Sequence, residues 1–388
     1  MAFTTRLSIL IFLFNTNILC QVECDDPLPP PPPPQFRTSA QYHFPYIHQS
    51  FQCASECRCS PFFPFAMYCE SRKLKYIPNI PAGTHYLYLQ HNEIEAVPEK
   101  AFINATSLQE IHLSYNKIKS SMIDKGIFGR LKSLVHLHLE HNKLDKVPSP
   151  LPSSLERLFL GFNKISKLPG DTFHGLVNIT MLNLCNNQLT DGSFKGNILA
   201  RMKSLMQVNL CNNKLKSMPA ELPASLLQLS VENNSISSLP PNYFKKVPHL
   251  ISLRMAHNKL KEVPYAVFNL SNLLELNMGY NKLSQAFYIP RRLEHLYLNH
   301  NHFTRFNITL MCPTTDLQNP KQLTYMRVDK NMLTRRFDAF LFACFPRLQA
   351  LVYGEQNVAP TAEHRREPRL FGMPVTSPDG EPDNPLPY

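Results

Sequence analysis

The chain has 388 residues, with 40 lysines and arginines against 29 aspartates and glutamates, and a formal charge of +11. A hydrophobic content of 43% is enough to bury a core over most of this length, which excludes a chain that is disordered throughout. The positive charge favours anionic partners, such as sulfated glycans or acidic proteins, but does not choose among them.

The N-terminus predicts a secretory signal peptide over residues 1–20. Arg6 is the only charge before a largely apolar run from Leu7 to Leu19, and cleavage is expected after Cys20. The alternative is an uncleaved anchor. The run is shorter than the ~18 apolar residues of a membrane helix, however, and no later stretch reaches that length. We therefore expect a secreted protein with no membrane span.

Residues 21–52 contain six consecutive prolines and predict a flexible proline-rich segment. Cys24 in this segment has no evident partner and is either free or paired between chains. At the other end, residues 361–388 are polar and proline-rich, which predicts a disordered tail.

A cysteine-rich segment, residues 53–69, follows the proline-rich one. Cys53, Cys57, Cys59 and Cys69 have the spacing C-x3-C-x-C-x9-C. In an exported chain this spacing predicts a disulfide-stapled cap over the open end of a core. Zinc ligation is the alternative, and the lack of paired C-x-x-C spacing argues against it.

The pattern L-x-x-L-x-L-x-x-N recurs through residues 70–360. It reads LQEIHLSYN at Asn116, LVHLHLEHN at Asn142 and LERLFLGFN at Asn163. A weaker copy opens the series at Asn92, and the degenerate copy LQALVYGEQ closes it. The remaining copies end at Asn187, Asn213, Asn234, Asn258, Asn281, Asn301 and Asn331. So many copies in register predict a leucine-rich-repeat solenoid of about twelve repeats.

The spacing within one repeat predicts its local structure. The second and third leucines alternate with polar residues, which is typical of a short strand with one buried face. Stacked repeats would pair these strands into a curved parallel sheet on the concave face. The asparagine is expected to turn inward and satisfy backbone groups. Proline-rich return segments such as VPSPLPSS favour an irregular, polyproline II or 3-10 convex side.

Four further cysteines lie within the repeats. Cys312 and Cys344 fall in and after the 30-residue step from Asn301 to Asn331, the long penultimate repeat, and we predict a disulfide between them. Cys185 and Cys211 occupy equivalent positions in consecutive repeats, about 4.8 Å apart. Their parallel side-chain directions make a bond and two thiols equally compatible with the sequence.

Two surfaces are candidate binding sites. The concave face is the usual ligand surface of a solenoid. A lysine one residue after many ladder asparagines predicts a basic ridge along one edge, which would suit sulfated glycan or acidic peptide. Ordinary solvated residues are the alternative for both. The concave candidates are Tyr88, His136, His138, Glu140, Arg157, Phe159, Arg254, Tyr297, Arg327 and Asp329. The ridge candidates are Lys117, Lys143, Lys164, Lys214, Lys259 and Lys282.

A metal or catalytic interpretation applies to His112, His136 and His138, which fall on neighbouring predicted strands beside Glu110 and Glu140. We favour solvated strand residues over zinc, because no second shell can be inferred from the sequence. No nucleophile elbow, phosphate loop or paired-carboxylate motif is present. We therefore predict no metal, no cofactor, no nucleic-acid partner and no enzymatic activity.

Five Asn-x-Ser/Thr sequons predict N-linked glycans on an exported chain. They begin at Asn104, Asn178, Asn233, Asn269 and Asn307.

With its four-cysteine cap and long penultimate repeat, the chain resembles the small leucine-rich proteoglycans of the extracellular matrix, in the class that contains fibromodulin, lumican and keratocan. The resemblance covers about residues 53–356. It implies bonds Cys53–Cys59 and Cys57–Cys69, keratan sulfate on some sequons, binding to fibrillar collagen, and roles in cell adhesion and mineralised tissue.

Within the repeats, stretches such as KYIPNIP and NNSISSLP resemble one particular member of this class. The N- and C-terminal segments of the chain differ from those of that member. That member has an acidic, tyrosine-rich N-terminal stretch and a long acidic tail. Tyr42 and Tyr46 lack acidic neighbours, the tail is not strongly acidic, and no Arg-Gly-Asp is present. A strong mineral site is therefore not expected, and an integrin would have to recognise another motif. The alternative functions are a sulfated-glycan or heparin-binding module and a ligand-binding ectodomain.

Overall fold

The computed structural model describes residues 53–357, except 317, 336 and 338. The predicted signal peptide, the proline-rich segment with Cys24 and the C-terminal tail lie outside the described residues. All described residues belong to one compact unit.

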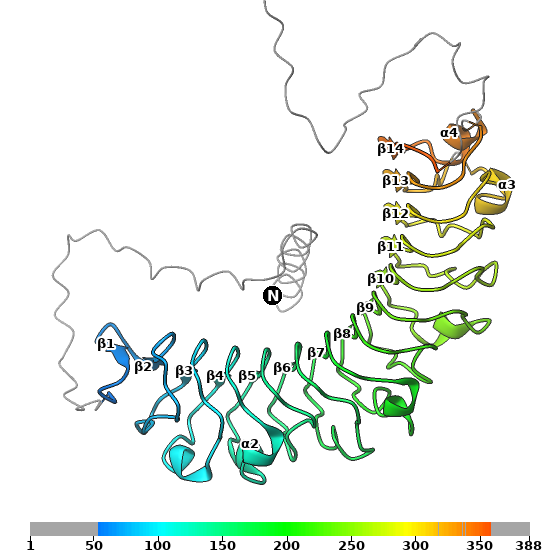
Figure 1. Cartoon of the computed structure of the whole chain (residues 1–388). Coiled ribbons are helices and arrows are strands. Elements are labelled where there is room, and N and C mark those ends of the chain that lie inside the picture. The colour runs from blue at the N-terminus through cyan, green and yellow to red at the C-terminus, as the bar shows by residue number, and fades with distance from the viewer. Residues whose placement is uncertain (1–52, 317, 336, 338, 358–388) are drawn as a thin grey trace, which may run out of the picture. The chain divides into compact units, whose positions relative to one another are not determined.

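The unit is a curved solenoid built on one fourteen-stranded sheet, whose strands follow one another in chain order (Figure 1). A cap hairpin, β1 (Arg58–Ser60) and β2 (Phe63–Tyr68), is antiparallel, and every later pairing is parallel. The strands that follow are β3 (Tyr86–Tyr88), β4 (Glu110–His112), β5 (His136–His138), β6 (Arg157–Phe159), β7 (Met181–Asn183), β8 (Gln207–Asn209), β9 (Gln228–Ser230), β10 (Ser252–Arg254), β11 (Glu275–Asn277), β12 (His295–Tyr297), β13 (Tyr325–Arg327) and β14 (Ala350–Val352).

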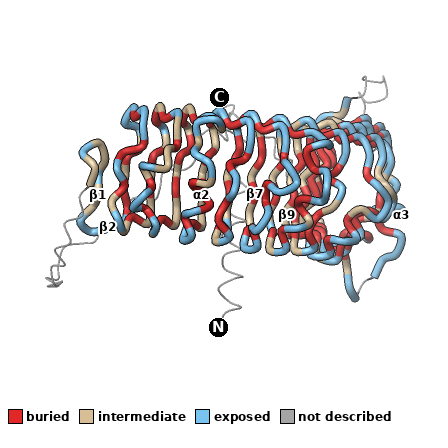
Figure 2. Tube along the Cα trace, turned by 90° about the horizontal axis from the view of Figure 1, so that it is seen from below, coloured by how far each residue is buried: buried red, intermediate tan, exposed pale blue. Residues whose placement is uncertain are grey.

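The leucine spacing explains this sheet. In β4 and its neighbours, the middle residue is buried and the residues on either side are half-buried. The middle residues stand in register, Leu87 beside Ile111, Ile111 beside Leu137 and Leu137 beside Leu158. Buried stretches therefore repeat from coil to coil along the solenoid (Figure 2). The predicted leucine-rich-repeat solenoid with a parallel concave sheet is confirmed.

The ladder asparagines join each repeat to the one before it. The side-chain oxygen of Asn116 accepts a hydrogen bond from the Ile94 backbone nitrogen at 3.0 Å, and its amide donates to the Leu89 and Leu113 carbonyls. In the last repeat, where the asparagine is missing, the Gln356 amide accepts from the Leu333 nitrogen and donates to the Val328 carbonyl. The inward asparagine thus satisfies backbone groups that no sheet bond reaches.

The residue before each ladder asparagine has a left-handed backbone with φ between 50° and 56°. This conformation reverses the chain direction after the strand and places the next side chain inward. These left-handed residues are His91, Tyr115, His141, Phe162, Asn186, Asn212, Asn233, His257, Tyr280, His300 and Lys330.

The convex side is irregular, as predicted, with short 3-10 turns on the outer side of the curve (Figure 1). It also contains three short α-helices that the proline-rich pattern did not predict. The 3-10 turns are η1 (Glu99–Phe102), η2 (Ser120–Met122), η3 (Asp191–Phe194) and η4 (Tyr243–Lys246), and the helices are α2 (Ile127–Arg130), α3 (Ile308–Met311) and α4 (Phe340–Cys344).

Disulfides close the N-terminal cap. The structure joins Cys53 to Cys59 and Cys57 to Cys69, the pairing that the resemblance implied. Cys69 is fully buried against the first repeat, so the cap covers the end of the core.

Of the two possibilities left open for Cys185 and Cys211, the structure has the bond. Their Cα atoms are 4.5 Å apart, and the bond links consecutive repeats in the middle of the solenoid.

The predicted Cys312–Cys344 disulfide is not formed in this structure, which corrects that expectation. The two cysteines lie at the ends of the packed helices α3 and α4, and both are buried. Each sulfur faces the other residue's carbonyl oxygen, at 3.9 Å from Cys312 Sγ and 3.6 Å from Cys344 Sγ.

Within the described residues, no helix is long and apolar enough to cross a membrane.

Candidate functional site

A stack of rings runs along the N-terminal half of the concave face. It contains the last residue of each strand from β2 to β6, and in-register parallel pairing places these residues about one strand spacing apart. We call it the concave aromatic column. Ring centroids are separated by 5.1 Å, 5.1 Å, 3.8 Å and 4.2 Å in the order Tyr68, Tyr88, His112, His138, Phe159.

Glu110 lies at the centre of a polar cluster beside this column. Its Oε1 is 2.6 Å from Nε2 of His112, and its Oε2 is 3.1 Å from Nδ1 of His136. Burial acts to raise the pKa of the Glu110 carboxyl, but the hydrogen bonds from His112 and His136 outweigh it, so that the pKa is well below its usual range. Glu110 is therefore ionised at neutral pH.

His138 and Glu140 form the second half of the cluster. Burial lowers the pKa of His138, and the hydrogen bond that the ring donates to the Glu140 carboxylate opposes that effect. His138 Nδ1 is 3.4 Å from Glu140 Oε1, whereas Glu140 Oε2 is buried with no hydrogen-bond partner among the described residues. Together, Glu110, His112 and His138 place three possible metal-ligand atoms within 4.8 Å of one another.

Ion pairs occupy the C-terminal half of the concave face. Arg254 Nε is 3.0 Å from Glu275 Oε1, and Arg327 Nε is 2.7 Å from Asp329 Oδ1. Glu232 lies near the first pair, and burial raises the pKa of its carboxyl. The guanidinium groups are therefore fixed in position by carboxylates but stay partly exposed.

The other concave candidates are placed as predicted on the strands. Arg157 stands in register with His136, and the ring of Tyr297 is 5.3 Å from that of Tyr325. Sequence reasoning did not select Tyr68 or Tyr325, although both occupy the strand positions used to choose the others.

A second aromatic column lies at the left-handed positions along one edge, and sequence reasoning missed it. We call it the edge aromatic column. Its first block joins His91, Tyr115, His141 and Phe162, with centroids 4.4 Å, 4.0 Å and 3.9 Å apart. Its second block joins His257, Tyr280 and His300, at 3.9 Å and 3.9 Å. The available signal was the ring that precedes so many ladder asparagines.

Burial lowers the pKa values of His257 and His300 in the second block, with a smaller opposing effect of Asp329 on His300. The amide nitrogen of Asn299 is 3.2 Å from Nδ1 of His300, a contact that is favourable only while that nitrogen carries no proton. Arg327 and Lys330 also disfavour the charged imidazole.

Acidification is therefore expected to destabilise this block. An imidazole whose pKa is lowered by folding contributes its full stability above the unfolded pKa of about 6.5, and the contribution is lost as pH falls through the folded pKa. The melting temperature should be lower at pH 5.5 than at pH 7.5. The double variant His257→Phe/His300→Phe keeps the stacked rings and should show a smaller decrease, as measured by thermal melts. An equal decrease in the variant, or an altered one in the exposed control His174→Phe, would contradict this assignment.

The basic ridge is only partly available for a ligand. Lys117 Nζ lies 3.0 Å from Glu93 Oε2, so a carboxylate of the preceding repeat already neutralises it. The other five ridge lysines are exposed at equivalent positions of their repeats, namely Lys143, Lys164, Lys214, Lys259 and Lys282.

All five sequon asparagines are exposed. Two of them also have local backbone roles. Asn307 caps α3 by accepting from the Leu310 nitrogen, and Asn233 holds a left-handed position immediately before the ladder residue Asn234.

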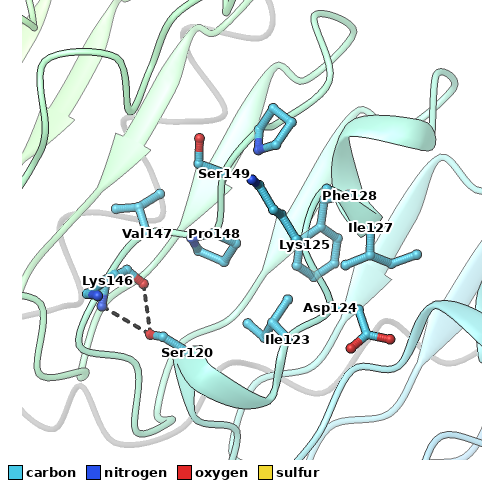
Figure 3. Close-up of a pocket in the computed structure, with 12 residues that line it drawn as sticks. Ser120, Ile123, Asp124, Lys125, Ile127, Phe128, Lys146, Val147, Pro148 and Ser149 are labelled. Atoms are coloured by element: carbon cyan, nitrogen blue, oxygen red, sulfur yellow. Dashed lines mark hydrogen bonds between the residues drawn. The ribbon is translucent and has the colours of Figure 1, made fainter.

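A small pocket of about 220 Å³ lies between the return segments of two repeats (Figure 3). Ser120 on one side bonds the backbone of Lys146 on the other, and Asp124, Lys125 and Pro148 complete much of the wall. Its lining contains no histidine or cysteine and none of the predicted binding residues.

The described site is thus an open, curved sheet face lined by rings and paired charges, like the extended concave surfaces that repeat proteins use for binding. The Leucine rich repeat family matches residues 83–144, 153–215, 203–260 and 224–283. A leucine-rich-repeat chain from an octameric complex of Latrophilin 3, Unc5D and FLRT2 shares the fold. Its TM-score is 0.63 at 24% identity, over 80% of this chain and 86% of that one.

Whole-length relatives define the family more narrowly. The chain is 51% identical to osteomodulin of Bos taurus, over 92% of this chain and 87% of the relative. It is 44% identical to keratocan of Mus musculus, over 79% and 90%. The chain belongs to the extracellular-matrix family of small leucine-rich proteoglycans that includes osteomodulin and keratocan. Osteomodulin is the member to which KYIPNIP and NNSISSLP pointed, and that prediction is confirmed.

Proposed function

We propose that the chain is secreted into the extracellular matrix and binds fibrillar collagen through the concave face of the solenoid. Membership in a family of matrix proteoglycans supports the location. The observation that carries the binding proposal is the row of half-buried rings and fixed guanidinium groups along one open sheet face.

The chemistry of that face suits a triple helix. Collagen chains are polyproline II helices, rich in proline and carrying charged side chains outward. Aromatic surfaces bind polyproline II segments well, because the segments are already extended and lose little entropy. Arg254 and Arg327 can pair with collagen carboxylates, while Glu275 and Asp329 hold the two guanidinium groups in place.

The test is saturation binding of the full chain to type I collagen fibrils at physiological salt. Reversing both guanidinium charges, Arg254→Glu/Arg327→Glu, is expected to weaken binding by about tenfold or more, since charged pairs at interfaces contribute a few kcal/mol. The matched control Arg201→Glu makes the same charge change on the return side of the solenoid and should bind normally. Thermal melts establish that each variant is folded.

A sulfated-glycan module is the second candidate, favoured by the exposed ridge lysines. Two results together would support this candidate: the wild-type protein binds heparin but not collagen, and the triple variant Lys143→Gln/Lys164→Gln/Lys214→Gln loses heparin binding. The basic ridge, and not the concave face, would then be the functional binding site. A pure glycan binder would also leave the diameter of collagen fibrils unchanged during assembly.

We further propose N-glycosylation at the five exposed sequons, with keratan sulfate on some of them. Roles in cell adhesion and mineralised tissue stay predictions of the family resemblance.

A further inference from the structure

The polar cluster beside the concave aromatic column combines histidines and carboxylates in a way that an ordinary strand face does not require. Ligand atoms of Glu110, His112 and His138 lie within 4.8 Å of one another and come from the neighbouring strands β4 and β5. Ligands of a tetrahedral zinc ion are roughly 3.3 Å apart, given bond lengths near 2.0–2.1 Å. The two imidazoles stack at 3.8 Å with 13° between their planes, so binding one ion requires both rings to turn until a nitrogen of each points at it.

We propose that Glu110, His112 and His138 form a binding site for a divalent zinc ion on the concave face. Two imidazoles and one carboxylate are a common zinc ligand set that leaves a fourth position open. Imidazole ligands favour zinc and similar transition metals over calcium and magnesium, which prefer oxygen.

The groups around these ligands are arranged as a second shell. Nδ1 of His138 faces Glu140 Oε1 at 3.4 Å, which directs its other ring nitrogen, Nε2, to the metal. On the other side, Nδ1 of His136 is 3.1 Å from Glu110 Oε2 and holds that carboxylate in place. The sequence alone argued against a metal because no second shell could be inferred, and Glu140 and His136 occupy that shell in the structure.

The charges and walls of the cluster also fit a cation. Glu110 and Glu140 are both partly buried, and within the described part of the chain the second oxygen of Glu140 has no hydrogen-bond partner. A divalent ion would compensate the negative charge of these two partly buried carboxylates. Arg157 on β6 is a nearby cation, but it stands in register with His136. Tyr88 and Phe159 stack on the two ends of the His112–His138 pair and form the apolar walls of the cluster.

The test is isothermal titration of Zn²⁺ into the full, untagged chain, stripped with EDTA and then dialysed into pH 7.5 buffer containing excess Ca²⁺. We expect one saturable site that His112→Phe or His138→Phe weakens by at least about tenfold, because phenylalanine keeps the ring stack but supplies no ligand. Glu140→Gln is expected to weaken it by about 10–100-fold, as second-shell changes do.

The control is His257→Phe, which removes a stacked histidine from the edge aromatic column without touching the cluster. It should bind zinc as the wild type does. Thermal melts check that the variants fold, and Co²⁺ substitution should give the intense visible absorption of a tetrahedral site. The absence of saturable zinc binding by the wild type would overturn the proposal, as would full retention of the site in both His112→Phe and His138→Phe.

Discussion

Replacing the ladder residue Asn142 by alanine is expected to lower the free energy of unfolding by about 3 kcal/mol, because it leaves several buried backbone groups without partners. The Asn142 oxygen accepts from the Ile118 nitrogen at 3.0 Å. Its amide donates to three carbonyls, those of Leu113, Leu139 and Glu140, at 2.9 Å, 3.1 Å and 3.1 Å. Alanine satisfies none of these four groups, and the residue is only 8% exposed, so that water cannot readily replace them.

Urea denaturation of the purified chain measures this loss. The matched control is Asn104→Ala, since Asn104 is exposed, and its change should stay within about 0.5 kcal/mol. If Asn142→Ala were as mild as Asn104→Ala, the inward asparagine would not be the link between repeats that its bonds indicate.

Each of the three disulfides should stabilise the fold by an amount that increases with the length of the loop that it closes. Sequence separations are 26 for Cys185–Cys211, 12 for Cys57–Cys69 and 6 for Cys53–Cys59. Closing longer loops removes more entropy from the unfolded chain, so replacing each pair by alanines should cost about 3.5, 3 and 2 kcal/mol, respectively. Cys69 and Cys185 are both buried, so a cavity cost adds to the first two values alike and leaves the order unchanged.

The Cys185–Cys211 pair gives the largest expected effect, and Cys53→Ala/Cys59→Ala is its control. Both double variants are compared with the wild type by denaturant unfolding without reductant. A loss for Cys185→Ala/Cys211→Ala that is no greater than for the control would show that the bond contributes little to stability in solution.

Much of the fold could be predicted because the repeat encodes it directly. Alternating leucines define a three-residue strand, and the asparagine at a fixed distance closes the turn, so that strands such as His136–His138 followed from spacing alone. In-register stacking then placed Tyr88, His138 and Phe159 on one face.

Other features depend on details that the repeat pattern does not contain. The left-handed backbone before each ladder asparagine is occupied by residues as different as His91, Phe162 and Lys330, so residue type does not mark it. The diagonal pair of Arg254 with Glu275 depends on side-chain rotamers as well as register. At Cys312 and Cys344, proximity was predictable, but the turn of each sulfur toward a carbonyl was not.

The shape of the sheet also bears on self-association. The first and last strands of a stacked parallel sheet each have one edge with unpaired backbone N–H and C=O groups. Such an edge can pair with a strand of another chain. At the N-terminal end, the antiparallel cap hairpin β1–β2 breaks the parallel pattern that a second solenoid would have to extend. Within the described residues, β14 has a neighbour on one side only, but its three residues offer few backbone groups for a further strand. The solenoid should therefore resist end-to-end polymerisation, although each of its repeats is built to stack on the next.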